Sequence, residues 1–380
     1  MARTASPVVE PARQNIETKP VRHNGDTRSA RPNGEGQQSA GQSSETRIVN
    51  LALQGGGSHG AFTWGVLDKL LEDGRLRIDG LSATSAGAMN AGVYAYHHMI
   101  GGTDGARQGL HDFWQRISKE GDKTRNPMDA VFEGMNLGML SSAAMFETMT
   151  RMLSPYEFNP FNLNPLKDVL KASIDFDQLH HCVDTKLRIC ATNVRSGKIK
   201  IFANGEITPE VLLASACLPS LFQAVEIDGE HYWDGGYMGN PAIYPMFVGM
   251  ESSDVILVHI NPIIRPNLPK TSPEIMNRLN EISFNSTLMR EMRAVKFIKD
   301  IMDGDWIKDE HKHKLRYIFM HSIRDDATMA GLATASKGNT KWSFLTDLRD
   351  RGRATAGHWL AENFDHLGQR SSINLEKEFF

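Results

Sequence analysis

The chain has 380 residues, of which 40% are hydrophobic and 23% charged, values typical of a protein with a buried core. Its formal net charge is −3, so no basic excess over the whole chain favours binding to nucleic acid. No run approaches the roughly 18 apolar residues that a membrane-spanning helix needs, and no apolar segment near the start indicates a secretory signal, so we expect a cytoplasmic protein whose membrane contact is at most peripheral.

Residues 1–46 are polar, rich in Ser, Gln, Gly and Pro, and contain no aromatic residue. Such a segment cannot bury enough apolar surface to offset the entropy lost on ordering. We therefore expect a disordered tail, and we expect ordered structure to begin at Arg47.

Two units of strand, tight turn and helix are predicted within residues 47–98. A buried strand over 48–54 is followed by a glycine turn and a helix over 61–72, and a second strand ending near Ala83 precedes a helix over 88–98. This alternation is typical of a parallel sheet with helices on its faces.

Residues 101–180 give a weaker pattern, with a helix expected over 110–117 and a loop over 159–165, where two prolines disfavour helix. Five methionines lie within residues 135–152 of the stretch between them, and methionine side chains suit both an adaptable acyl-chain pocket and ordinary helix packing, so both interpretations stay open. Residues 101–180, and 101–165 in particular, are therefore a candidate insert or lid. The methionines are Met135, Met139, Met145, Met149 and Met152.

Strands return after this region. Two hairpins are expected, over 187–202 and 222–233, because a Ser-Gly and an Asp-Gly dipeptide join their apolar runs. A short helix beginning with proline is expected over 209–216, and a buried strand of parallel-sheet character over 254–260.

Apolar residues recur at helical spacing over 273–302. A helix with one basic face either lies on anionic lipid or packs its apolar face on the core with its charged side chains exposed to solvent, and both interpretations stay open. A last strand over 315–320 and a mainly helical region beyond Trp342 complete the prediction. The basic face consists of Arg290, Arg293, Lys296 and Lys299.

The run Gln54-Gly-Gly-Gly-Ser-His-Gly60 stands between the first strand and its helix. Glycines leave the backbone N–H groups uncovered, and the helix behind them adds a positive end, so the turn suits an anion. The anion is either a phosphate or the oxyanion of an ester intermediate. The run matches neither a nucleotide P-loop nor the pattern Gly-x-Gly-x-x-Gly.

Thr84-Ser85-Ala86-Gly87 lies between the second strand and its helix, where a nucleophile elbow presents its serine. Ala83 replaces the first glycine of the G-x-S-x-G pattern. A simple helix cap is the alternative reading of Ser85.

Asp234-Gly235-Gly236 follows the second hairpin. An aspartate beside two glycines often belongs only to a turn. It can also be a base, because its small neighbours let the carboxylate approach a serine within about 3 Å.

These three motifs together resemble the patatin-like phospholipase family, and the run Ala214-Ser-Ala-Cys-Leu-Pro219 also resembles an element of that family. The resemblance covers about residues 47–262. It implies an α/β fold of three layers, with a central, mostly parallel sheet between helices. We expect the catalytic domain over 47–330 and a helical region packed on it over 331–380.

The resemblance implies a lipid acyl hydrolase in which Ser85 is the nucleophile and Asp234 the base, with no catalytic histidine. It acts on carboxylic esters of glycerolipids or phospholipids, at a membrane surface, through an acyl-serine intermediate. An acyltransferase or thioesterase with the same dyad and a non-enzymatic lipid-binding protein are the alternatives. No cofactor or metal is expected, and the oligomeric state is left open.

The resemblance further implies an oxyanion hole formed by Gly55, Gly56 and Gly57, with the N–H groups of Gly56 and Gly57 as donors. His59 occupies a position that is usually Arg or Lys in the family, and it is a candidate contact for an anionic headgroup. Its charge would depend on pH.

Other nucleophiles and bases stay open at this stage. His259 and His321 are formal candidates for the third member of a Ser-Asp-His triad. The cysteines are too few and too widely spaced for a disulfide framework or metal cluster, and we expect reduced thiols, although Cys217 is an alternative nucleophile.

Overall fold

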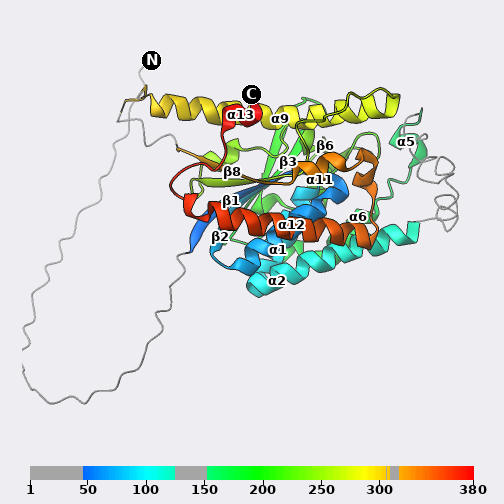
Figure 1. The fold of residues 1–380 in the computed structure, drawn as a ribbon. Helices are drawn as coiled ribbons and strands as arrows, with labels where there is room; N and C mark the ends of the chain where they lie inside the picture. The colour runs from blue at the N-terminus through cyan, green and yellow to red at the C-terminus, as the bar shows by residue number, and fades with distance from the viewer. Residues whose placement is uncertain (1–45, 125–151, 305, 309–315) are drawn as a thin grey trace, which may run out of the picture. The chain divides into compact units, whose positions relative to one another are not determined.

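The computed structural model describes residues 46–124, 152–304, 306–308 and 316–380, drawn in colour in Figure 1. Residues 1–45 of the expected tail, and four of the five methionines between 135 and 152, lie outside the described residues.

In the described part of the chain, eight strands form one sheet in the order β5-β6-β3-β2-β1-β7-β8, with β4 beside β3. The pairs β1–β2, β1–β7, β2–β3 and β7–β8 are parallel, and the pairs made by β4, β5 and β6 are antiparallel. The strands are β1 (Arg47–Leu53), β2 (Leu76–Ala83), β3 (Lys186–Asn193), β4 (Ile199–Ala203), β5 (Val225–Ile227), β6 (Glu230–Asp234), β7 (Asp254–His259) and β8 (Phe319–Arg324).

Helices cover both faces of this sheet. The longer ones are α1 (Gly60–Asp73), α2 (Ala86–Thr124), α6 (Pro165–Ser173), α8 (Pro209–Ser215), α9 (Ser272–Asp303) and α12 (Trp342–Asn363). The shorter ones are α5 (Pro155–Phe158), α7 (Phe176–Leu179), α11 (Asp326–Gly331) and α13 (Leu375–Phe379), and the 3-10 turns used below are η1 (Gly57–His59), η4 (Gly235–Tyr237) and η6 (Thr334–Gly338).

The layers follow from the two hydrophobic clusters. One cluster joins α1, α2 and α12 to the sheet, and the other joins α9 to the opposite face through Leu288, Met292 and Val295. Figure 1 shows α9 on one side of the strands and α1, α2 and α12 on the other. The predicted α/β class with a mostly parallel sheet between helices is confirmed.

Most predicted elements are present, and the two predicted hairpins are the antiparallel pairs β3–β4 and β5–β6. Two elements differ from the prediction, namely the last strand and the helices expected within residues 88–117. The last strand is Phe319–Arg324 and not 315–320, so its predicted start lay four residues early. The helices predicted over 88–98 and 110–117 belong to α2, which is interrupted at Gly102 (φ 61°, ψ −152°), a conformation that glycine adopts easily.

Helix α12 packs directly on α1. A Cβ atom on Gly65 would overlap the carbonyl oxygen of Arg349, and one on Gly352 would overlap that of Phe62, so the two backbones touch. Helical structure thus packs against the first βα unit, while the predicted division of the chain at residue 330 stays a prediction. No helix in the described ranges is long and apolar enough to cross a bilayer.

Helix α9 has the predicted length but not one continuous apolar face. Its C-terminal half packs Met292 and Val295 into the core, whereas its N-terminal half buries Glu281 and Asn285 and exposes apolar side chains. The exposed set is Ile275, Met276, Leu279 and Ile282. The expected pattern of apolar residues inside and charges outside is therefore inverted at this end.

Candidate active site

Ser85 lies in the turn between β2 and α2 with φ 55°, a left-handed conformation that is uncommon for a residue with a side chain. Its backbone N–H donates to the hydroxyl oxygen of Ser215 at 2.9 Å. The strained turn carries the side chain to the C-terminal edge of the parallel strands, and Ser85 is partly exposed there.

Small residues make this turn possible. A Cβ atom on Gly55 would lie 2.5 Å from Ser85 Cβ, and one on Gly87 would overlap the carbonyl oxygen of Leu53. The glycine loop and the serine turn therefore approach each other more closely than side chains would allow.

Asp234 is the last residue of β6 and is 1% exposed. Its Oδ1 accepts the N–H of Gly236 at 2.7 Å, and the Ser85 side chain lies near enough to its carboxylate to lower its pKa. Burial raises the pKa of Asp234 to about 7, against the opposing effects of Gly236, of Ser85 and of the charge on Lys337.

The run 214–219 contacts both of these residues. Besides the bond from Ser85 to Ser215, the N–H of Asp234 donates to the carbonyl oxygen of Cys217 at 2.8 Å. The sequence singled out this run without assigning it a role. Cys217 itself is buried, and burial together with the nearby Asp234 charge raises its pKa to about 12, so it stays a thiol and not a nucleophilic thiolate.

The glycine loop leads from β1 into η1 and then α1. The N–H of Gly55 donates to Asn240 Oδ1 at 2.7 Å, so it is already engaged. Among the described residues, the N–H groups of Gly56 and Gly57 have no acceptor. Both lie at the N-terminal end of the η1–α1 helical segment, whose dipole favours negative charge.

Buried amide side chains fix this loop in place. Gln54 Oε1 accepts the backbone N–H groups of Ile260 and Asn261 at 2.9 and 3.0 Å, and Gln54 Nε2 donates to the carbonyl oxygen of Asn240 at 3.2 Å. Sequence reasoning missed Gln54, Asn240 and Asn261 as site residues. The available signal was a polar residue directly after an apolar strand, which holds for Gln54 and Asn261.

His59 is 3% exposed, and its Nε2 lies 2.7 Å from the hydroxyl of Ser336 in η6. Burial, and then the positive charges of Lys337 and Arg265, lower the pKa of His59 to about 3. The ring is thus neutral and already bonded, which does not favour the suggested contact with an anionic headgroup.

The two histidines considered for a triad have other surroundings. His321 Nε2 lies 3.0 Å from Asp254 Oδ1, and its Nδ1 lies 3.1 Å from Ser372 Oγ. His259 is buried at the end of β7, with its ring beside Phe379 and neither ring nitrogen bonded within the described part of the chain. Neither makes a hydrogen bond to Ser85 or Asp234 among the described residues.

Comparison with known proteins gives a family. The model of the patatin-like phospholipase family matches residues 51–247, which include Ser85, Asp234 and the glycine loop. A search of curated proteins finds no match. Among solved structures, VipD from Legionella pneumophila is 15% identical (TM-score 0.32), covering 80% of this chain and 67% of that one. The ExoU–SpcU complex of Pseudomonas aeruginosa is 13% identical (TM-score 0.36), covering 84% of this chain and 52% of that one.

Proposed function

Because the chain belongs to the patatin-like phospholipase family and so to the lipid hydrolases, we propose that it cleaves carboxylic esters of glycerolipids, phospholipids in particular, through an acyl intermediate on Ser85. The pairing of the Ser85 side chain with the buried Asp234 carboxylate, whose pKa Ser85 lowers, carries this proposal. It joins a nucleophile and a base that are far apart in sequence, beside two N–H groups that have no other acceptor in the described residues.

In the proposed reaction, Asp234 accepts the hydroxyl proton as Ser85 Oγ attacks the ester carbonyl. The carbonyl oxygen becomes negative and is bound by the N–H groups of Gly56 and Gly57, where one donor is typically worth about a hundredfold or more in rate. The alcohol leaves with the proton, and Asp234 then accepts a proton from water as that water attacks the acyl-serine. The free fatty acid leaves, and Ser85 regains its proton.

Gly55 contributes differently in this proposal. Its N–H is bonded to Asn240, so it is not an oxyanion donor. Its role is to leave room for Ser85, because a side chain at this position would clash with Ser85. His59 is left out as a headgroup contact, because its ring is neutral and bonded to Ser336.

The pKa of Asp234 sets the pH range of the reaction. A base must be ionised, and a pKa of about 7 means that activity rises with pH through neutrality. We propose that this limb of the pH profile belongs to Asp234.

We also propose that the N-terminal half of α9 contacts the lipid surface. The loop that precedes α9 also exposes apolar side chains, Leu268 and Ile264, each 78% exposed. The loop that carries Ile264 and Leu268 follows β7, and Asn261 at its start donates to the carbonyl oxygen of Gly55 at 2.7 Å, so this apolar patch is connected along the chain to a residue that contacts the glycine loop. An apolar surface beside a lipid site is the arrangement that lets an ester leave the bilayer without crossing water.

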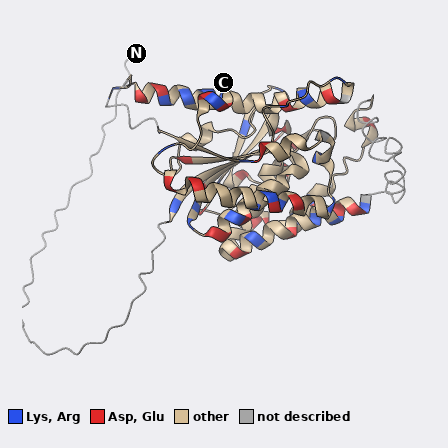
Figure 2. Cartoon of the chain, viewed as in Figure 1, with Lys and Arg blue, Asp and Glu red and all other residues tan. Residues whose placement is uncertain are grey.

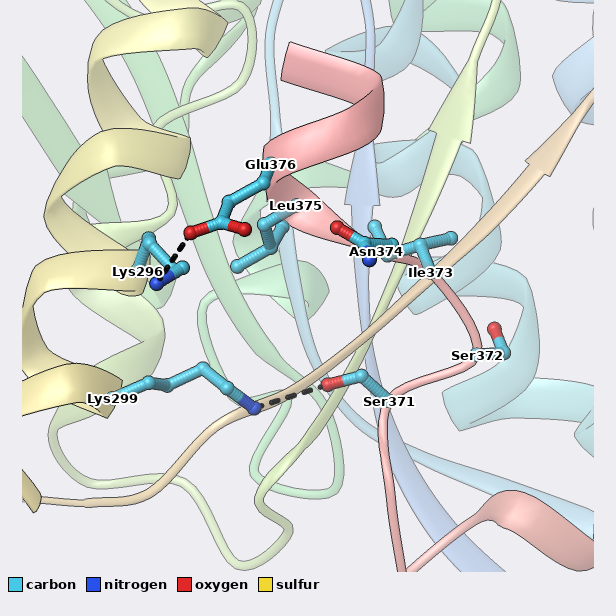
Figure 3. Close-up of a pocket in the computed structure, with 8 residues that line it drawn as sticks. All are labelled: Lys296, Lys299, Ser371, Ser372, Ile373, Asn374, Leu375 and Glu376. Atoms are coloured by element: carbon cyan, nitrogen blue, oxygen red, sulfur yellow. Dashed lines mark hydrogen bonds and ion pairs between the residues drawn. The ribbon is translucent and has the colours of Figure 1, made fainter. Parts of the chain in front are cut away.

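The other half of α9 offers a weaker surface for anionic lipid than its sequence suggests. Lys296 pairs with Asp300 and Glu376, and Figure 2 shows residues of both charge signs along α9. A pocket of about 430 Å³ lies here against residues 371–376, and Figure 3 shows Lys299 directed at Ser371 across it. These lysines are therefore engaged within the protein.

Covalent labelling with a fluorophosphonate probe tests the proposed function. We expect the wild-type chain to label on Ser85, Ser85→Ala to lose all labelling, and Asp234→Asn to label at least about a hundredfold more slowly. Wild type should then release fatty acid from phospholipid vesicles. No labelling of the wild type would point to a lipid-binding protein, and transfer of the acyl group to an added alcohol in preference to water would point to an acyltransferase.

A further inference from the structure

We propose that Lys337, which lies in η6 near the C-terminal end of the chain, is a positioning residue of the active site that supplies positive charge beside the glycine loop and Asp234. The inference rests on the proposed function. The loop's own titratable side chain, His59, is neutral, so the positive charge comes from a segment that is remote in sequence.

The side chain of Lys337 reaches the loop through a single intermediary. Its Nζ donates to Asn261 Oδ1 at 2.8 Å, and Asn261 Nδ2 donates to the carbonyl oxygen of Gly55 at 2.7 Å. The ammonium group is thus one amide side chain away from the backbone that precedes Gly56 and Gly57.

The backbone around Lys337 also touches the loop. A Cβ atom on Gly57 would overlap the carbonyl oxygen of Lys337, and the neighbouring Ser336 is bonded to His59. Two consecutive residues of η6 therefore contact η1 directly, which fixes where the lysine side chain begins.

The start of this segment is fastened as well. Arg265 donates through its guanidinium to the carbonyl oxygens of Ala330 and Leu332, and its other nitrogens bind the carboxylate of Glu281 at 2.6 and 3.2 Å. Glu281 is 3% exposed and is shared with Arg278. The segment that carries Lys337 is therefore tied to α9 through Arg265 and the buried carboxylate of Glu281.

Of the two carboxylates that interact with the charge of Lys337, Asp234 is the one without another cationic partner among the described residues. Burial lowers the pKa of Lys337, as does Arg265, while Glu281 and Asp234 raise it. The Glu281 carboxylate is already bonded to two arginines, whereas Asp234 has no cationic hydrogen-bond partner among the described residues. Among the described residues, the Asp234 charge also acts on Cys217 and Tyr237, whose pKa values are both raised to about 12, so neither is charged near neutrality.

Lys337 therefore has one effect before the reaction and another during it. It lowers the pKa of Asp234 against the larger raising effect of burial, which keeps more of the base ionised at neutral pH. When negative charge moves from Asp234 to the ester oxygen at Gly56 and Gly57, the same ammonium is one amide side chain away from the backbone that leads to these glycines. A fixed positive charge near both places needs no rearrangement during the step.

The test is the pH dependence of probe labelling at Ser85 in the full-length chain. In Lys337→Met we expect the midpoint of the rising limb to move to higher pH by about one unit, because removing an opposite charge near a buried carboxyl has effects of this size. Lys337→Arg should restore the midpoint close to that of the wild type. Lys299→Met is the matched control, since Lys299 is also desolvated and bonded but lies at the pocket of Figure 3.

A merely structural lysine would lower the folded fraction without moving the midpoint. A folded Lys337→Met chain with the wild-type midpoint overturns the inference and leaves the proposed function standing. Failure of both Lys337→Met and Lys337→Gln to fold, with Lys299→Met folded, also overturns it, because Lys337 is then structural. A wild-type chain that does not label at Ser85 overturns the proposed function and this inference with it.

Discussion

The hydroxyl oxygen of Ser215 accepts the backbone N–H of Ser85 at 2.9 Å, so a residue at the end of α8 holds the turn that presents the nucleophile. The left-handed backbone of Ser85 needs such support, because its N–H has turned away from the regular pairing of β2.

Ser215→Ala should lower the rate of probe labelling at Ser85 about tenfold or more and destabilise the chain by about 1–3 kcal/mol, since the partly buried N–H of Ser85 loses its acceptor. Ser173→Ala is the matched control, because Ser173 is also a buried serine but its hydroxyl has no partner in the described residues. Labelling kinetics and urea unfolding measure the two effects. Equal behaviour of the two variants would argue against a role for Ser215 in the turn.

Gly87→Ala should destabilise the chain by about 2 kcal/mol or more, because the new methyl group meets the backbone carbonyls of Leu53 and Gln54, which cannot move independently of β1. Gly101→Ala lies in the same helix, where a methyl group meets nothing within 4 Å, and should be neutral or slightly stabilising. Urea midpoints measure the difference. A Gly87→Ala chain as stable as Gly101→Ala would contradict the close approach of loop and turn.

Asp234→Asn should abolish activity and yet raise stability at alkaline pH. Folding raises the pKa of Asp234 from 3.8 to about 7, so the folded chain favours the protonated carboxyl, and this contribution is present below about pH 4 and lost as pH rises through 7. The variant should exceed the wild type at about pH 8 by at most about 4 kcal/mol, and by almost nothing at about pH 4.

Thermal unfolding at both pH values checks this prediction. The exposed Asp177→Asn is the control for the loss of one carboxylate from the surface. An Asp234→Asn advantage of the same size at both pH values would mean that lost strain, and not a buried charge, explains it.

Leu279→Glu should weaken binding to anionic phospholipid vesicles at least about tenfold while leaving hydrolysis of a small soluble ester unchanged, because a carboxylate on the exposed apolar patch opposes contact with lipid. Phe297→Glu is the matched control on the same helix, since Phe297 is 61% exposed and Leu279 is 54% exposed. Vesicle co-sedimentation measures binding. An equal loss in both variants would indicate a general charge effect and not contact through the N-terminal half of α9.

The structural features of this protein that depend on neighbouring residues could be predicted from the sequence. The paired strand–turn–helix units, the two hairpins and the serine turn depend on neighbouring residues, such as Ser85 among small residues and the Asp-Gly dipeptide before β6. The resemblance to the family predicted that Ser85, Asp234 and the glycines belong to one site. The start of β8 was missed by four residues, since short apolar runs fix the existence of a strand better than its ends.

What the sequence could not give was the set of contacts between distant segments. The residues around Gly55 do not indicate that its N–H donates to the side chain of Asn240. Those around His59 do not indicate that burial keeps its ring neutral. The exposed apolar end of α9 has the same helical period as its buried end, so periodicity alone could not tell them apart. Turn chemistry and periodicity are properties of a few consecutive residues, whereas burial, charge state and the partner of Lys337 exist only after the sheet has brought remote segments together.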